Sequence, residues 1–271
     1  HRDLHSFPTR RSSDLSKTDL MPNMISLKEF LEKKTLFFSE INIKTVKIAW
    51  DYISVFSKPK CTIHVIGTNG KGSTGRILAE YLYKKNYSVL HYTSPHILKF
   101  NERIWIDGKD VDDETLEINH IRLQKLLPQE LIDNLSYFEY TTLLALLLSN
   151  DKDFLVLEAG LGGEFDATNV IKNDLTILTT VDYDHQEFLG NTIEEITSTK
   201  VRSMDSAVIV AKQIHDEVYE IARNIAISKN LRYFRFDDFE NSKKTYNIYE
   251  QRFLNDNLLS VISELEYLKI P

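Results

Sequence analysis

The feature that most constrains this chain is a glycine-rich loop placed directly after an apolar segment. Residues 61–66 are CTIHVI and residues 67–74 are GTNGKGST. This pattern predicts a buried strand, a tight loop and a helix that follows over 74–85. Glycines let backbone N–H groups wrap closely around an anion at a helix start, and Lys71 adds a positive charge. The loop therefore predicts that the chain binds a nucleoside triphosphate.

The spacing within this loop is unusual. In the common phosphate loop, G-x-x-x-x-G-K-[ST], a hydroxyl residue follows the lysine directly. Here Gly72 stands between Lys71 and Ser73. Lys71 could instead be a solvated lysine near a helix start. A cation at that position opposes the helix dipole, so an anionic ligand explains it better.

Composition narrows the classes of function. The chain has 271 residues, a formal net charge of -7 and 42% hydrophobic residues, enough for one large domain or two small ones with a substantial core. It has no long basic run, which disfavours a nucleic-acid partner. No apolar stretch is long enough to span a bilayer, and we expect a cytoplasmic location. Its one cysteine, Cys61, excludes an internal disulfide and is expected to fill the core.

The first fifteen residues stand apart from the rest. Residues 1–15, HRDLHSFPTRRSSDL, have no apolar core of the kind that a secretory signal needs. They resemble translated vector or adapter sequence, and we expect the native start at Met21 or Met24. A basic disordered arm is the alternative. Residues 16–271 are expected to form the domain.

Strands and helices are expected to alternate after two initial helices. The expected strands are 61–66, 88–92, 153–158, 174–181 and 206–210, with a hairpin over 104–111. The expected helices are 26–37, 44–56, 74–85, 113–126, 137–149, 193–201 and 214–228. Near-continuous apolar strands separated by helices predict an α/β fold with a mostly parallel sheet flanked by helices. In such sheets, ligands bind beyond the carboxyl ends of the strands.

Glycine is concentrated at two loops that follow predicted strands. Seven of the nine glycines stand at positions 67, 70, 72 and 75 and at 160, 162 and 163. Glycine permits backbone conformations that other residues avoid, and a binding site needs them more than a core does.

Several polar residues follow the predicted strands. Glu158 ends an apolar strand beside the second glycine cluster, where it could hold Mg²⁺, a hard ion that prefers oxygen; the alternative is a loop carboxylate facing water. His185 follows the next strand, and the alternative for it is a core histidine. Ser94 could offer a hydroxyl to the same ion, although TSPH alone is a turn with a proline. Lys200, taken alone, is expected on the surface.

The order of the motifs is more specific than any one of them. GTNGKGST, then TSPH with FNERI, then EAGLGGEFDATN, then DH with LG resemble the folylpolyglutamate synthase and dihydrofolate synthase family, a branch of the Mur-type ligases. The resemblance is strong from about Ile63 to Lys200. It implies a phosphate-loop domain of the Mur ligase central type and an ATP-dependent amide ligase. In such an enzyme ATP phosphorylates a carboxylate of a pteroate or folate, and the amine of L-glutamate attacks the acyl phosphate.

The resemblance also implies ATP and Mg²⁺ as cofactors, small molecules as the partners, and a monomer when full length. It implies catalytic roles for Lys71, Glu158, His185 and Lys200. The implied nucleotide-binding residues are Gly67, Thr68, Asn69, Gly70, Lys71, Gly72, Ser73, Thr74 and Asn257. The implied metal ligands are Ser73, Ser94, Glu158, His185 and, if it is carbamylated, Lys200. The implied substrate-binding residues are Pro95, His96, Phe100, Asn101, Arg103, Asp166, Thr168 and Asn169.

The sequence departs from the family pattern in three places. The family usually has arginine after Gly-Gly, where this chain has Glu164, and Ala-Gly-Ile after the lysine, where this chain has Val-Arg-Ser. We also expect residues 16–271 to lack the family's smaller carboxyl-terminal domain. Two alternatives remain open: another Mur-type ligase that joins a different carboxylate to an amino acid, and a nucleotide-binding module without catalysis. The pairing of TSPH with FNERI favours folate.

Overall fold

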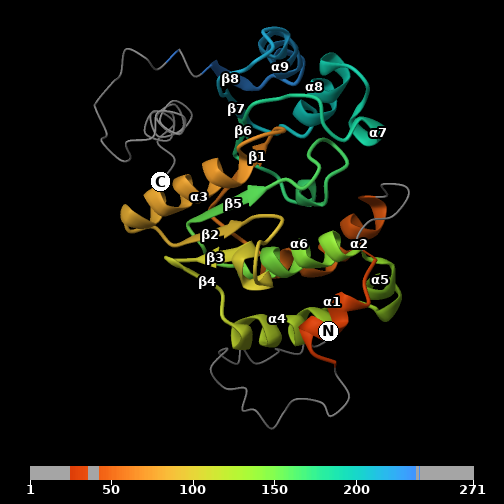
Figure 1. Ribbon diagram of the computed structural model, residues 1–271. Helices are drawn as coiled ribbons and strands as arrows, with labels where there is room; N and C mark the ends of the chain where they lie inside the picture. Colours follow the sequence, from red (N-terminus) through yellow and green to blue (C-terminus); the bar gives the residue numbers. More distant parts are fainter. Residues whose placement is uncertain (1–24, 36–42, 236–237, 239–271) are drawn as a thin grey trace, which may run out of the picture.

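The computed structural model describes residues 25–35, 43–235 and 238, and its frame is a single twisted sheet (Figure 1). The sheet has eight strands in these residues. Six adjacent strands, in the spatial order β2, β5, β1, β6, β7 and β8, run parallel to one another. The hairpin of β3 and β4 adds an antiparallel edge. In spatial order the strands are β4 (Lys109–Asp110), β3 (Ile104–Ile106), β2 (Val89–Tyr92), β5 (Phe154–Glu158), β1 (Cys61–Ile66), β6 (Leu175–Leu178), β7 (Ala207–Val210) and β8 (Arg232–Arg235). The α/β fold with a mostly parallel sheet is thereby confirmed.

Helices connect the strands and cover the sheet. They are α1 (Leu27–Glu32), α2 (Ile43–Ile53), α3 (Lys71–Lys84), α4 (Asp113–Leu126), α5 (Gln129–Asn134), α6 (Tyr137–Leu148), α7 (Gln186–Leu189), α8 (Ile193–Val201) and α9 (Glu217–Ser228). Short 3₁₀ segments cover Ser54–Phe56, Phe100–Arg103 and Ala167–Val170. In the part of the chain with described structure, no helix is both long enough and apolar enough to cross a membrane.

The alternation of side chains along β1 assigns the helices to two faces. Ile63 and Val65 lie in one buried cluster with Leu78 of α3. His64 and Ile66 point to the opposite face. Ile66 lies there in a buried cluster with residues of α8 and α9. The helix α3 therefore packs on one face of the sheet, and α8 and α9 pack on the other.

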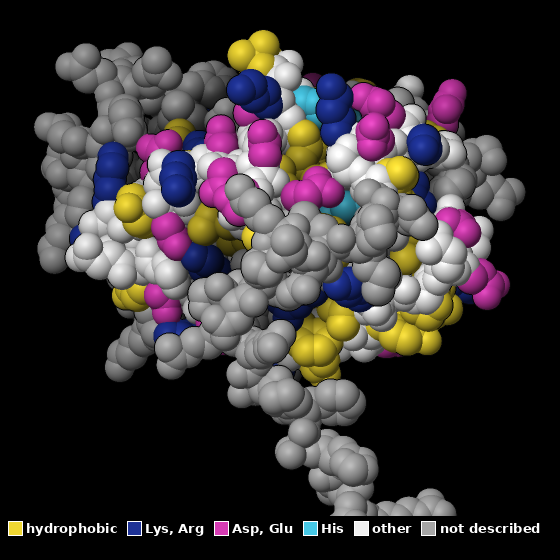
Figure 2. Space-filling view, turned by 90° about the horizontal axis from the view of Figure 1, so that it is seen from below, with side chains coloured by type: hydrophobic (Ala, Val, Ile, Leu, Met, Phe, Trp, Pro, Cys, Tyr) yellow, Lys and Arg dark blue, Asp and Glu magenta, His cyan; other side chains and the backbone are white. Residues whose placement is uncertain are grey.

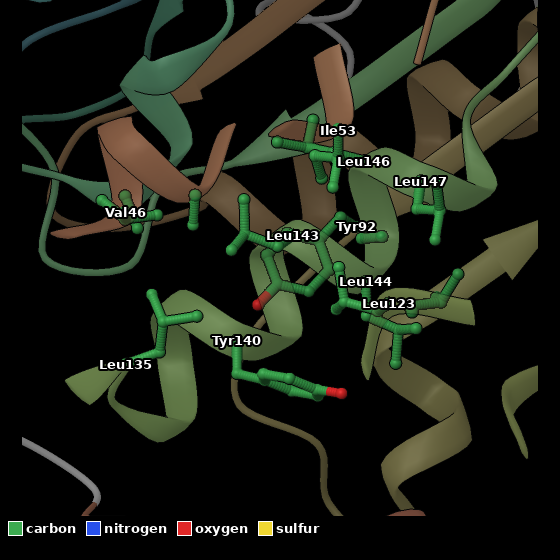
Figure 3. Packing of buried hydrophobic residues seen from close by; sticks show 14 of the residues in the cluster. Val46, Ile53, Tyr92, Leu123, Leu135, Tyr140, Leu143, Leu144, Leu146 and Leu147 are labelled. Carbon is green, nitrogen blue, oxygen red and sulfur yellow. The ribbon is translucent and has the colours of Figure 1, made fainter. Parts of the chain in front are cut away.

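The largest cluster lies on that second face, around α6 (Figure 3). Residues 143–148, LLALLL, make this helix apolar almost all round, as expected for a helix buried on several sides. Leu143 and Leu144 pack with Tyr92 from β2 and with Val46 from α2. This core includes residues of β2 and β5; Ser94 follows β2 two residues after its end, and Glu158 is the last residue of β5.

Most of the predicted elements are confirmed to within a residue or two, and five boundaries are wrong by three residues or more. The helices predicted over 26–37 and 44–56 end early, at Glu32 and Ile53, and the helix predicted over 214–228 begins late, at Glu217. The other two boundaries are wrong in an informative way. The helix predicted to begin at 74 begins at Lys71, because Gly70 adopts a left-handed conformation and lets the helix start at once. The strand predicted over 174–181 ends at Leu178, because the next residues bond to the glycine loop instead. The short helices α5 and α7 and the edge strand β8 are additional to the prediction.

On the face shown in Figure 2, acidic, basic and hydrophobic side chains are interspersed.

Cys61 is buried, and burial raises the pKa of its thiol to about 12, which agrees with the expected core role.

Candidate active site

The phosphate loop lies at the carboxyl end of β1 and the beginning of α3. Gly70 precedes the helix with φ 84°, a conformation that glycine adopts without strain. The first N–H groups of a helix have no partner within it, so α3 presents donors at this end. Lys71 Nζ donates to the carbonyl oxygens of Gly67 at 3.2 Å and Thr68 at 3.1 Å, so this ammonium lies across its own loop.

The loop is held by the segment that follows β6. The N–H groups of Thr68 and Asn69 donate to the Thr180 carbonyl oxygen at 2.9 and 3.1 Å. Thr68 Oγ1 donates to the carbonyl oxygen of Asp182 at 3.0 Å. The shape of the loop therefore depends on residues that are more than 100 positions away in the sequence.

Glu158 ends β5, the neighbour of β1, and its carboxylate lies under the first turn of α3. It is only 5% exposed. It accepts hydrogen bonds from the Thr93 hydroxyl and from Ser94 N, the latter at 3.1 Å. A Cβ on Gly72 would lie 3.3 Å from Glu158 Oε2, so glycine here allows the helix to approach the carboxylate. Burial raises the pKa of Glu158, although its two hydrogen bonds and Lys71 act in the opposite direction.

Lys200 lies in the interior, so the expectation of a surface position is wrong. Its side chain is 0% exposed on α8, and Nζ donates to the carbonyl oxygens of Gly67 and Leu161, each at 3.0 Å. These bonds connect the two glycine loops. Burial, and then the charge of Lys71, lower the pKa of Lys200 to about 8.

The remaining predicted metal ligands are placed differently from one another. Ser94 is half-buried beside Glu158, and Ser73 is exposed in the first turn of α3. His185 has a left-handed backbone with φ 45°, and its Nε2 lies 3.5 Å from Asp184 Oδ1. Within the described ranges, no three histidine, cysteine, aspartate or glutamate side chains converge to hold a metal. The metal roles stay predictions, and Asn257 lies outside the described residues.

The predicted substrate loop, residues 95–103, contains a buried arginine. Arg103 is 8% exposed, its Nε donates to His96 Nδ1 at 2.8 Å, and its guanidinium lies 5.1 Å from the centre of the Tyr137 ring. Burial and the charge of Arg103 lower the pKa of His96. The Phe100 ring lies 6.3 Å from the His96 ring. None of the ion pairs in the described part of the chain includes Arg103.

Two other residues of this loop differ in setting. Asn101 Nδ2 donates to the Val111 carbonyl oxygen at 2.8 Å and to Asp113 Oδ1 at 2.7 Å. This side chain therefore holds the loop against the start of α4. Pro95 is exposed.

The DATN segment, residues 166–169, is hydrogen-bonded to the second glycine loop, residues 160–163. Asp166 is buried and accepts hydrogen bonds from Gly162 N at 2.9 Å and from the Thr168 hydroxyl at 2.6 Å. Because that hydroxyl is then an acceptor for His64 Nε2 at 2.7 Å, Asp166 and Thr168 connect the loop to β1. Asn169 Nδ2 donates to the Gly163 carbonyl oxygen, and Asn169 Oδ1 is buried with no protein partner in the described structure. Asn169 is therefore the member of this segment whose side-chain oxygen has no hydrogen-bond partner among the described residues.

Sequence reasoning missed three residues that shape the site. Thr93, next to Ser94, was detectable from its place at a strand end. Arg202 forms an ion pair with Glu164 at 3.1 Å, and the paired departures from the family pattern were a signal for it. Gln213 is hydrogen-bonded to Thr179 and Val181, next to the residue that holds the phosphate loop, and it gave no signal in the sequence.

Comparison with known proteins gives the class. Residues 65–267 match the model of the Mur ligase middle domain, and the chain therefore belongs to this family. Its curated relatives include the Lacticaseibacillus casei folylpolyglutamate synthase, 36% identical, with 75% of this chain and 50% of that protein covered. The Bacillus subtilis (strain 168) dihydrofolate synthase/folylpolyglutamate synthase is 38% identical, with 60% and 40% covered. The resemblance predicted from the motifs is confirmed.

Solved structures agree with this branch of the family. Helicobacter pylori folylpolyglutamate synthetase has a TM-score of 0.73 and 38% identity, covering 89% of this chain and 62% of its own. Escherichia coli FolC in complex with DHPP and ADP has a TM-score of 0.68 and 29% identity, covering 76% and 50%. The chain spans 50% and 40% of the length of the two curated relatives named above.

Proposed function

We propose that this chain is the nucleotide-binding part of an ATP-dependent amide ligase that adds L-glutamate to dihydropteroate, a folate or both. The observation that carries the proposal is the meeting of Lys71, the free N–H groups of α3 and the buried Glu158 at adjacent strand ends. Phosphoryl transfer needs positioning and charge neutralisation more than covalent help, and this site offers both. The ADP bound by the Escherichia coli relative supports it.

The residues present fit a magnesium ion. Glu158 is a buried carboxylate, and no ion pair within the described residues includes it, so a cation would relieve the cost of its burial. Glu158 and the hydroxyls of Ser94 and Ser73 would hold the ion, with His185 as a further ligand if its loop approaches. Bound there, Mg²⁺ would neutralise phosphate charge. Carboxylate and hydroxyl oxygens are the ligands that this ion prefers.

Lys71 and the loop N–H groups would hold the transferred phosphate and its neighbour. Lys71 now donates to two carbonyl oxygens of its own loop, so phosphate oxygens would replace partners that the ammonium already has. The site is thus prepared for a negative charge.

Arg103 is suited to the acceptor substrate. It is a buried guanidinium that donates to a histidine instead of a carboxylate, and such a group favours an anion. We propose that Arg103 and His96 bind the anionic end of the substrate, that Phe100 contacts its ring and that Asn169 Oδ1 accepts a hydrogen bond from it. A solved relative, FPGS in complex with AMPPCP and folate, supports this class of substrate.

Lys200 has two possible states. A pKa of about 8 leaves a fraction of neutral amine near neutral pH, and carbamylation needs that form. The present contacts to two carbonyl oxygens are those of an amine donor, and a carbamate there would require the two glycine loops to separate. Carbamylation therefore stays a prediction. We also propose that the protein acts as a cytoplasmic monomer with small molecules as its only partners.

The test is mass spectrometry of reactions that contain the chain, Mg-ATP, L-glutamate and either dihydropteroate or tetrahydrofolate. The Lacticaseibacillus casei relative serves as the positive control. A product one glutamate heavier would establish the ligase and identify its acceptor. If the relative makes product and this chain makes none, ligase activity of the chain as it stands is contradicted.

A further inference from the structure

The side chain of Gln213 contacts the segment that holds the phosphate loop, and none of the predicted site roles includes this residue. Gln213 follows β7 and is 9% exposed. Its Oε1 accepts a hydrogen bond from Val181 N at 2.9 Å, and its Nε2 donates to the carbonyl oxygens of Thr179 at 3.1 Å and Ala211 at 3.0 Å. Its backbone N–H donates to the hydroxyl of Tyr219 at 2.9 Å.

These contacts imitate a strand. Residues 179–181 continue beyond the end of β6, and β7 has no strand residues opposite them, since it ends at Val210. Along one edge of an extended segment, the C=O of one residue and the N–H of the residue two places on point the same way. The Gln213 amide bonds to this pair in Thr179 and Val181, and thereby replaces the missing neighbour.

The other edge of the same segment holds the phosphate loop. Thr180 O accepts hydrogen bonds from both Thr68 N and Asn69 N of the loop. Thr179 N donates to Ile66 O at 2.8 Å, at the end of β1 where the loop begins. The segment 179–181 is thus bonded to the loop on one side and to Gln213 on the other. We propose that Gln213 is a positioning residue, which holds the phosphate loop in the shape that binds a nucleotide by way of residues 179–181.

The first test compares Gln213→Met with the wild-type chain. Methionine has a similar length but removes the amide, so Val181 N loses its buried partner. We expect faster hydrogen exchange at the N–H groups of Thr68 and Asn69, and roughly tenfold weaker binding of Mg-ATP. The matched control is Gln124→Met, which removes a hydrogen bond to the Tyr140 hydroxyl at 3.2 Å in the other half of the molecule and should change neither.

The second test uses Gln213→Glu, which keeps the size and makes the contact titratable. Burial raises a carboxyl pKa, and only the protonated acid can both donate to Thr179 O and accept from Val181 N. Nucleotide affinity relative to the wild-type chain should therefore improve as pH falls from 8 to 6. The ionisable neighbours His215, Asp182 and Tyr219 are present in both proteins, so the ratio removes the part of their pH dependence that does not depend on residue 213. This variant also decides the question if Gln213→Met does not fold.

The proposal rests on the proposed nucleotide site, and the outcomes keep the two apart. A wild-type chain that does not bind Mg-ATP sinks the proposed function, while the exchange rates at Thr68 and Asn69 still test the contact. Unchanged exchange at both N–H groups in Gln213→Met would overturn the role of Gln213. So would faster exchange with unchanged nucleotide affinity, or a Gln213→Glu ratio that does not vary with pH.

Discussion

At the scale of single residues, the site gathers charge in places where charge is costly. Glu158 and Lys200 are both buried. Burial raises the pKa of Glu158 and lowers the pKa of Lys200, and both shifts favour the neutral form of the group. Lys71 and Lys200 share the carbonyl oxygen of Gly67 as an acceptor. Perturbed pKa values of this kind are concentrated at functional sites. The arrangement is explained by a bound anion and cation more readily than by stability.

Glu158→Gln tests this cost directly. Because the pKa of Glu158 is raised in the folded state, its contribution to stability is full below the unfolded pKa and is lost as pH rises through the folded pKa. At neutral pH and without metal, we expect the variant to melt at the same temperature as the wild-type chain or higher, by thermal unfolding with and without Mg²⁺. Mg²⁺ should raise the melting temperature of the wild-type chain alone. A variant that melts well below the metal-free wild-type chain would show that the carboxylate is there for stability.

At the scale of elements, α3 owes its position to glycines on its underside. Gly72 lies over Glu158, and Gly75, one turn further on, lies over His91 of β2. His91 is fully buried, and neither ring nitrogen has a hydrogen-bond partner in the structure described. Small residues three apart thus let the helix that begins the phosphate site lie close to the sheet.

Gly75→Ala is expected to destabilise the protein. An added Cβ would lie 2.6 Å from His91 Nε2, and overpacking of this kind costs about 1–3 kcal/mol. That loss exceeds the roughly 0.5–1 kcal/mol that alanine normally gains over glycine within a helix. Urea unfolding should show a net loss for Gly75→Ala alone and a recovery of part of it when His91→Ala is added. If the single variant is as stable as the wild-type chain, the close approach of α3 is not a constraint.

The sequence predicted elements well where the local pattern was strong. The strand over 61–66 and the helices over 113–126 and 193–201 match the structure at both ends. The strand β8 was missed because Arg232 and Arg235 frame two aromatic residues and leave no apolar run. The burial of Lys200 was missed for a different reason: its partners lie in loops 39 and 133 residues away, and no local pattern records that.

At the scale of the whole molecule, three buried histidines make stability sensitive to acid. Burial lowers the pKa of His64, His91 and His120, that of His91 to about 3. At pH values below about 6.5, the ordinary pKa of histidine, the unfolded chain therefore binds protons at these positions while the folded chain does not. Stability should fall as pH decreases from 7 to 5. Glu158 acts with the opposite sign.

The size of this effect can be measured at His91. Between its folded and unfolded pKa values, one such group changes the free energy of unfolding by up to about 1.4 kcal/mol per pH unit. Urea midpoints at pH 7, 6 and 5 should decline less steeply in His91→Leu than in the wild-type chain. Equal slopes would mean that His91 is not held neutral in the folded state.

The nucleotide site itself is best tested by a calorimetric titration of the chain with ATP, in the presence and absence of Mg²⁺. We expect one saturable site, tighter with Mg²⁺. We expect Lys71→Ala to weaken it at least about 30-fold, since losing a hydrogen-bonded charge contact costs on the order of 2–5 kcal/mol. Lys85→Ala, at the other end of α3, is the control and should bind as the wild-type chain does. A folded wild-type chain that binds no ATP, or a Lys71→Ala variant with unchanged affinity, would contradict the assignment of this loop as a nucleotide site.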